Sequence, residues 1–202
     1  MLRRTVLNPT LKRSGLQFLS LRAGIYTDAF PLYLNWYPSS TKILLPKLEP
    51  QVSWGKIAFA SRDELGEGIA VLIAKGGPAA FPSIVPRTDK NIILLTGAYV
   101  DSLEDMAHAL VEAHKGSELR IEWLDDPEHW IEESARDDVG GKQRGWFEAR
   151  LKVFEGFCKG EAEVVDSALE VLLGRRPERG VDGVRRLVGG GDRGFTWHQN
   201  HA

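Results

Sequence analysis

The sequence lacks most features that mark a specialised class of protein. A single cysteine, Cys158, excludes a disulfide framework within the chain and makes a reducing compartment the expectation. No apolar run approaches the length of about 20 residues that a transmembrane helix needs. The net charge is −2, so no overall field attracts nucleic acid or an acidic membrane. We therefore expect a protein that binds neither nucleic acid nor membranes.

Metal-ligand and nucleophile motifs are also missing. His108 and His114 are six positions apart on one predicted helix and do not share a face, while His198 and His201 lie near the C-terminus. Neither pair has the further ligands that a metal site requires, so we expect no metal. A G-x-S-x-G motif is absent as well. Cys158 falls on the apolar face of a predicted helix, where it is interpreted as a small buried hydrophobe.

The first 27 residues contain no acidic side chain, although they include Arg3, Arg4, Lys12, Arg13 and Arg22. One interpretation is a folded start, with a short helix over 4–14 and a strand over 16–22. The alternative is a mitochondrial transit segment, which has this kind of composition. The strand-like run favours the folded interpretation, so we expect a cytoplasmic protein and keep a mitochondrial location as the alternative.

Strand and helix patterns alternate over residues 1–124, which is typical of an α/β domain. Ser61 and Glu64 have capping-box spacing, and Ser102 precedes an amphipathic helix that should end at Gly116. Three prolines make residues 37–53 read as a surface excursion. The predicted strands are 16–22, 57–60, 92–95 and 119–124, and the predicted helices of this part begin at 61 and 102.

Only helical patterns follow residue 125, and Pro127 suits the first turn of the first helix. Trp123, Trp130 and Trp146 lack an accompanying basic stripe, so core packing explains them better than base stacking. We predict an α/β part over 1–124, a helical subdomain over 125–188 and a disordered, glycine-rich tail over 189–202. The predicted apolar helix faces lie within 147–158, 164–172 and 181–188.

Three stretches, in order, resemble the NmrA-like family, an atypical branch of the short-chain dehydrogenase superfamily. They are LQFLSLRAGIYTDAF (16–30), GKIAFASRDELGEGIAVLIAKG (55–76) and NIILLTGAYVDSLEDMAHALVEAHKG (91–116). The helical residues that follow, including EAEVVDSALEVLLGRRP, look like the C-terminal subdomain of the family. The resemblance covers nearly all of 4–188. It implies a Rossmann-like parallel sheet with a C-terminal α-helical subdomain, and NAD(P) as the cofactor of the intact family.

The chain also departs from the family pattern. The superfamily holds the pyrophosphate of the dinucleotide with G-x-x-G-x-x-G after a first strand, and this motif is absent; the only dense glycines are Gly189-Gly190-Gly191. There is no Tyr-x-x-x-Lys, which NmrA-like proteins commonly lack. Asp28-Ala29 stands where the family often has Glu-Asn. We therefore expect the C-terminal two-thirds of a family member, with the opening βαβ unit missing, that does not bind NAD(P) tightly.

Arg22, Gly24 and Tyr26 are the candidate pocket residues, because they follow a strand in the region where open α/β sheets bind ligands. By resemblance, this segment lines the nicotinamide and substrate end of the site. The alternative is that Arg22 pairs with a carboxylate and Tyr26 simply packs. Ser61 and Asp63 are interpreted as helix-start residues, and no catalytic residue is predicted.

Three functional hypotheses remain open. The first is a truncated family member that is inactive alone as an oxidoreductase on quinone-like or carbonyl substrates. The second is a redox-sensing or regulatory binding module, which recruits a protein partner through its helical subdomain or an exposed sheet edge. The third is a fragment of a longer NAD(P)H-dependent quinone or carbonyl oxidoreductase.

Overall fold

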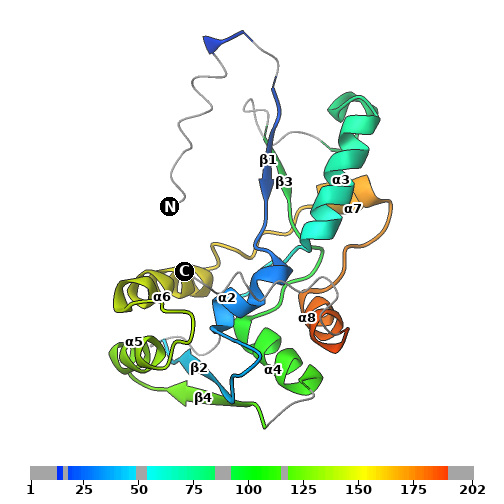
Figure 1. Cartoon of the computed structure of the whole chain (residues 1–202). Helices are drawn as coiled ribbons and strands as arrows, with labels where there is room; N and C mark the ends of the chain where they lie inside the picture. The colour runs from blue at the N-terminus through cyan, green and yellow to red at the C-terminus, as the bar shows by residue number, and fades with distance from the viewer. Residues whose placement is uncertain (1–12, 16–17, 49–53, 85–91, 115–117, 191–202) are drawn as a thin grey trace.

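Two separate pairs of parallel strands organise the chain. The computed structural model describes residues 13–15, 18–48, 54–84, 92–114 and 118–190 (Figure 1). Strand β1 (Ser20–Ala23) pairs with β3 (Ile92–Leu95), and β2 (Lys42–Pro46) pairs with β4 (Arg120–Leu124). Both pairs are parallel, with Leu21 opposite Ile93 in one and Ile43 opposite Ile121 in the other. The predicted α/β class is confirmed.

Most predicted strands are confirmed, but the apolar run at 57–60 is not a strand. Its residues are buried, yet they form only isolated bridges, from Ala60 to Tyr26 and from Ile57 to Asp101. The backbone of this segment bonds to three different parts of the chain, at Ile25, Asp101 and Ala162. Because no single neighbouring strand supplies its partners, a regular ladder does not form.

The prediction of a surface excursion over 37–53 is also wrong. Strand β2 lies inside this range, and its side chains Ile43 and Leu45 are buried. Pro46 ends the strand, and in the described residues β2 is an edge strand of a two-stranded sheet, where proline is tolerated. Residues 49–53 lie outside the described residues. The prolines of this range are typical of a loop, so the sequence pattern did not predict a strand there. The burial of β2 depends on its pairing with β4, about 80 positions later.

The helices follow the predicted order with shifted boundaries. Val164 and Val165 are exposed and precede their helix, so the prediction that they lie on its apolar face is wrong. The helix after Ser102 ends at Ala113, and Gly116 lies outside the described residues, as does most of the predicted helix over 4–14. The helices and 3-10 turns are η1 (Thr27–Ala29), α2 (Phe30–Leu34), α3 (Arg62–Ala74), η2 (Pro78–Ala80), α4 (Leu103–Ala113), α5 (Pro127–Arg136), α6 (Arg144–Cys158), α7 (Ala168–Leu173) and α8 (Gly180–Gly189).

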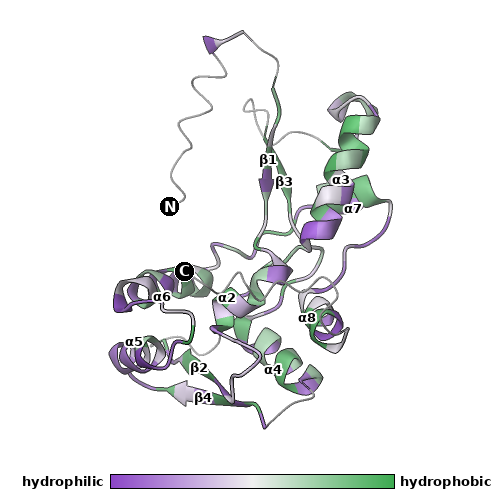
Figure 2. Cartoon of the chain, in the orientation of Figure 1, coloured by the Kyte–Doolittle hydropathy of each residue, from purple (hydrophilic) through white to green (hydrophobic). Residues whose placement is uncertain are grey.

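The core consists of two apolar clusters. The larger one gathers side chains from β2, α2, α4, α5, α6 and α8, and the smaller one lies between β1, β3, α3 and α7. Figure 2 shows the apolar stretches of β3 and α3 that contribute to the second cluster. Of the predicted core residues, Trp130 is fully buried and Cys158 only half-buried. None of the described helices is long and apolar enough to cross a membrane.

The helices after residue 125 pack on different parts of the fold. Helices α5 and α6 contact each other, and α5 also contacts β2, whereas α7 packs on α3 and β3. Helix α8 packs along α4 (Figure 1). The division into parts 1–124, 125–188 and 189–202 stays a prediction.

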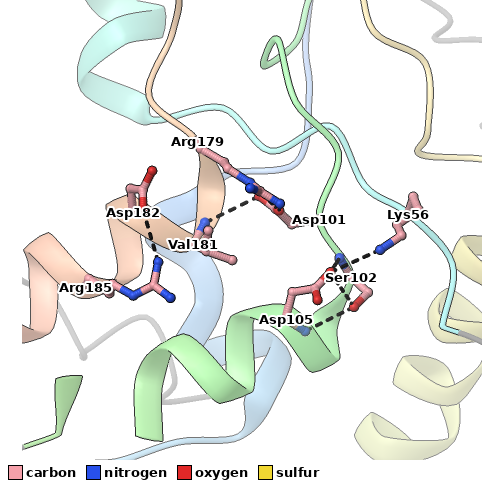
Figure 3. A network of polar contacts seen from close by, with 8 residues as sticks. All are labelled: Lys56, Asp101, Ser102, Asp105, Arg179, Val181, Asp182 and Arg185. Carbon is pink, nitrogen blue, oxygen red and sulfur yellow. Dashed lines mark hydrogen bonds and ion pairs between the residues drawn. The ribbon is translucent and has the colours of Figure 1, made fainter. Parts of the chain in front are cut away.

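A buried carboxylate, Asp101, joins the start of α8 to the rest of the fold (Figure 3). Its Oδ1 accepts hydrogen bonds of 2.7 Å from Nε and Nη2 of Arg179, and its Oδ2 accepts one of 3.4 Å from the backbone N–H of Val181. Its own backbone forms both hydrogen bonds of the bridge to Ile57. The side chain is 1% exposed, so it depends on these donors in place of water.

We expect Asp101→Ala to lower the free energy of unfolding by about 2 kcal/mol or more, because it removes charge-assisted hydrogen bonds from a buried position. Asp182→Ala is the matched control: Asp182 pairs with Arg185 in the same network but is exposed, so its loss should cost about 0.5 kcal/mol. Urea unfolding of both variants checks this. Equal losses of unfolding free energy in the two variants would contradict the anchoring role of Asp101.

Two serines with the same predicted role provide a second comparison. Ser102 caps α4: its hydroxyl accepts from Asp105 N–H at 3.0 Å, and the Asp105 carboxylate accepts from Ser102 N–H at 2.7 Å. Ser61 precedes α3 but makes no capping hydrogen bond, so that predicted capping box is wrong. Ser102→Ala should therefore cost about 1 kcal/mol in thermal or urea unfolding, and Ser61→Ala clearly less. A larger loss of stability in Ser61→Ala than in Ser102→Ala would show that the cap hydrogen bond does not stabilise α4.

Candidate functional site

The predicted pocket segment lies where the carboxyl ends of β1 and β3 meet. Strand β1 ends at Ala23, and Gly24 N–H then donates to the carbonyl of Leu95, the last residue of β3, at 2.7 Å. Two residues further on, Tyr26 bridges to Ala60 in parallel fashion. Ligands of open α/β sheets bind at this kind of edge. The assignment of Arg22, Gly24 and Tyr26 to a pocket stays a prediction.

The three predicted residues differ in their surroundings. Arg22 is exposed, and within the described ranges it forms no ion pair, so the alternative of a paired Arg22 finds no support there. Tyr26 is 39% exposed, which leaves part of its ring open to a ligand. Gly24 is half-buried, and a Cβ at this position would lie 3.1 Å from the carbonyl oxygen of Ala58. Gly24 therefore serves the close crossing of two chain segments.

Gly97 makes an even closer crossing just after β3. A Cβ there would lie 1.8 Å from the carbonyl oxygen of Phe59, so only glycine fits. Both glycines thus allow backbone segments of the protein itself to approach each other. The space beside them is filled by residues 58–59, which excludes a phosphate from the same place.

Asp28 has a role that the sequence did not indicate. Its Oδ2 accepts a hydrogen bond of 2.9 Å from the backbone N–H of Arg62, the first residue of α3. The carboxylate therefore satisfies an N-terminal amide of a helix that begins 34 positions later. This contact explains why the Ser61 side chain is not needed as a cap.

Carboxylates occupy the N-termini of most long helices in the described chain. Asp105 lies in the first turn of α4 and accepts from Ser102 N–H, Asp126 caps α5 by accepting a hydrogen bond of 3.0 Å from Glu128 N–H, and Asp101 accepts from the first turn of α8. Asp28 does the same at α3. A negatively charged phosphate is repelled from a helix start that already holds a carboxylate. Helix α6 begins at Arg144 without a side-chain cap.

Beside the pocket segment, two aromatic rings hold the guanidinium of Arg150. The guanidinium carbon of this α6 residue lies 5.0 Å from the ring centre of Tyr33 on α2 and 4.5 Å from that of Trp146 on α6. Burial lowers the pKa of Arg150, and burial raises the pKa of the Tyr33 hydroxyl, against the opposing effect of Arg150. The electrostatic effect of Tyr26 also raises the pKa of Tyr33, so the two tyrosines are close enough to interact. Sequence reasoning missed this cluster, because its residues come from distant segments.

A tyrosine and a lysine do meet in this fold, although no Tyr-x-x-x-Lys exists. Lys142 Nζ donates to the hydroxyl of Tyr37 and pairs with Asp138 Oδ1 at 2.7 Å, and the Tyr37 hydroxyl donates to the same carboxylate at 2.7 Å. The side chains of Lys142 and Asp138 are inaccessible to solvent. Burial and Asp138 raise the pKa of Tyr37, the opposite of what a proton donor needs. The cluster is therefore a structural element of the core.

We expect Asp138→Asn to lower the free energy of unfolding by about 3–5 kcal/mol, because it leaves the Lys142 ammonium buried without its counterion. The double variant Asp138→Asn/Lys142→Met should recover most of that loss in urea unfolding, and no recovery would contradict the pairing. Burial opposes ionisation of Asp138, but hydrogen bonds from Lys142 and Tyr37 hold its pKa below the ordinary value. Its contribution is therefore complete above an unfolded pKa of about 4 and is lost as pH falls through the lower folded value.

The comparisons with known proteins relate the chain to one family. No family model matches it. It is 34% identical over 192 residues to an NmrA-like family domain-containing oxidoreductase, flvB, of Aspergillus flavus, an alignment that covers 95% of this chain. The chain spans 56% of that relative's length. The predicted relationship to the NmrA-like family is confirmed.

Solved structures show the same fold. An NADPH-dependent quinone oxidoreductase of Escherichia coli matches with a TM-score of 0.61 at 18% identity, over 89% of this chain and 58% of that one. A triphenylmethane reductase of Citrobacter sp. matches with a TM-score of 0.59 at 17% identity, over 90% and 56%. A nucleoside-diphosphate-sugar epimerase of Staphylococcus aureus has a TM-score of 0.59 at 19% identity, over 88% and 55%. These likenesses establish a Rossmann-like α/β fold.

NAD(P) is the cofactor that this family implies, and the described residues do not fit its pyrophosphate. The close-approach positions Gly24 and Gly97 are filled by the chain's own backbone. Four helix starts already hold carboxylates. A phosphate cradle needs the reverse, a glycine-lined loop with free N–H groups at a helix start.

Proposed function

We propose that this chain forms the substrate-binding portion of an NmrA-like NAD(P)H-dependent oxidoreductase and, by itself, neither binds a dinucleotide tightly nor catalyses the reduction. The relationship to an NmrA-like oxidoreductase along 95% of the chain supports the family assignment. The occupied helix starts support the absence of tight dinucleotide binding. Hydride transfer needs the cofactor held against the substrate, which these residues alone do not provide.

The substrate end of this site is formed by the segment after β1 and by α2 and α6. Tyr26 offers an exposed ring at the sheet edge, and the half-buried rings of Tyr33 and Trp146 on the adjacent helices lie against the Arg150 guanidinium. Flat aromatic faces suit a planar, electron-poor substrate. The structural likeness to a quinone oxidoreductase agrees with a quinone or related carbonyl compound. Recruitment of a protein partner through the 125–188 helices or the sheet edge stays a prediction.

We expect a simple quinone to bind the purified chain weakly in calorimetric titrations, and Tyr26→Ala to weaken that binding about threefold or more through the lost stacking surface. Tyr99→Ala is the matched control, because Tyr99 is similarly exposed (36%) but its ring lies against the Arg176 guanidinium. NADPH should show no saturable binding at micromolar concentrations, and no quinone-dependent NADPH oxidation should be detected. Turnover by the 202-residue chain, or equal quinone binding by both variants, would contradict the proposal.

A further inference from the structure

The guanidinium of Arg150 is partly buried without a counterion. In the part of the chain that the structure describes, no carboxylate lies within ion-pair distance of it, and its buried Nε has no hydrogen-bond partner. Arg144, six positions earlier on the same helix, contacts three carboxylates: Glu128, Glu132 and Glu148. The lack of a partner is thus specific to the inner face of α6 and does not follow from a shortage of acidic residues.

Burial of an uncompensated charge is unfavourable, and the structure offsets only part of it. The faces of Tyr33 and Trp146 provide cation–π attraction, which is worth less than an ion pair in a partly buried place. Burial lowers the pKa of the group, yet a guanidinium stays protonated at neutral pH. The position therefore carries a stable positive charge, and its buried Nε–H has no hydrogen-bond acceptor.

The neighbouring lysine, by contrast, has a counterion. Lys142 also lies over the Trp146 ring, at 5.2 Å, but its charge is paired with Asp138 and its side chain is inaccessible. The site therefore presents one net positive charge, which matches a monoanion better than a doubly charged phosphate. The planar fork of a guanidinium suits the two oxygens of a carboxylate.

We propose that Arg150 determines the substrate class of this site by binding the carboxylate of a planar aromatic acid, whose ring lies against Tyr33, Tyr26 or both. The assignment rests on the proposed function, because that function makes the region around Tyr26 the substrate end. The assignment is supported by the position of this guanidinium, which lies against aromatic rings from α2 and α6.

The test is calorimetric titration of the full 202-residue chain with 2-naphthoate and with its neutral analogue 2-naphthamide. The wild-type chain should bind the acid at least tenfold more tightly than the amide. Arg150→Gln should weaken naphthoate binding about tenfold or more and leave naphthamide binding unchanged, while Arg150→Lys should lie between. Arg144→Gln is the matched control, since it removes an equal charge from an exposed, paired position on the same helix.

Several outcomes would overturn the assignment. One is equal affinity of the wild-type chain for the acid and the amide. Another is an equal loss of naphthoate affinity in Arg150→Gln and Arg144→Gln. A third is displacement of naphthoate by equimolar inorganic phosphate. The unchanged amide affinity shows that the variants are folded. If quinone binding depends on Tyr26 but naphthoate binding is independent of Arg150, the inference fails and the proposed function survives. The opposite pattern leaves an acid-binding site and removes the proposed function.

Discussion

One buried carboxylate, Asp101, joins three segments that lie far apart in the sequence. Its backbone pairs with Ile57, and its side chain holds Arg179 and the first turn of α8. Since residue 101 directly precedes the cap of α4, the same point also fixes where α8 packs along α4. The crossing of 57–60 beneath the ends of β1 and β3, and with it the candidate site, therefore depends on how this carboxylate is satisfied.

Acidic side chains at helix starts recur throughout the fold. Asp28, Asp101 and Asp126 each accept a backbone N–H from the first turn of a helix, and Asp105, in the first turn of α4, accepts the N–H of the N-cap residue Ser102. Such contacts stabilise helices by satisfying otherwise unpaired donors. They also remove the positive helix ends that bind phosphates elsewhere in α/β proteins. The same interactions that stabilise this chain thus argue against a dinucleotide held by it alone.

Two cations, one just before α6 and one on it, lie in opposite situations. Lys142, just before the helix, is enclosed with Asp138 and Tyr37 and has all its charge compensated within the core. Arg150, two turns further on, meets aromatic faces and no described carboxylate. A paired buried charge contributes to structure, while an unpaired one at a site edge is available for recognition. Trp146 lies between them and contacts both.

Local patterns in the sequence determined a large part of this protein. The apolar run at 92–95 became β3, the periodic residues after Ser102 became α4, and Asp126-Pro127 started α5, because each signal depends only on neighbours within a turn or a strand. The motif order was enough to identify the NmrA-like relationship. Tertiary structure alone decided the remainder. Residues 57–60 form no regular β-ladder, β2 lies in a proline-rich stretch, and the side chain that binds the N-terminus of α3 is Asp28 and not Ser61. It also decided that Lys142 is paired with Asp138 and that Arg150 meets no carboxylate among the described residues. The partners of 57–60, β2 and Asp28 lie tens of positions away, and Lys142 meets Tyr37 across 105 positions. The free energy that selects these conformations therefore comes from contacts that no local pattern encodes.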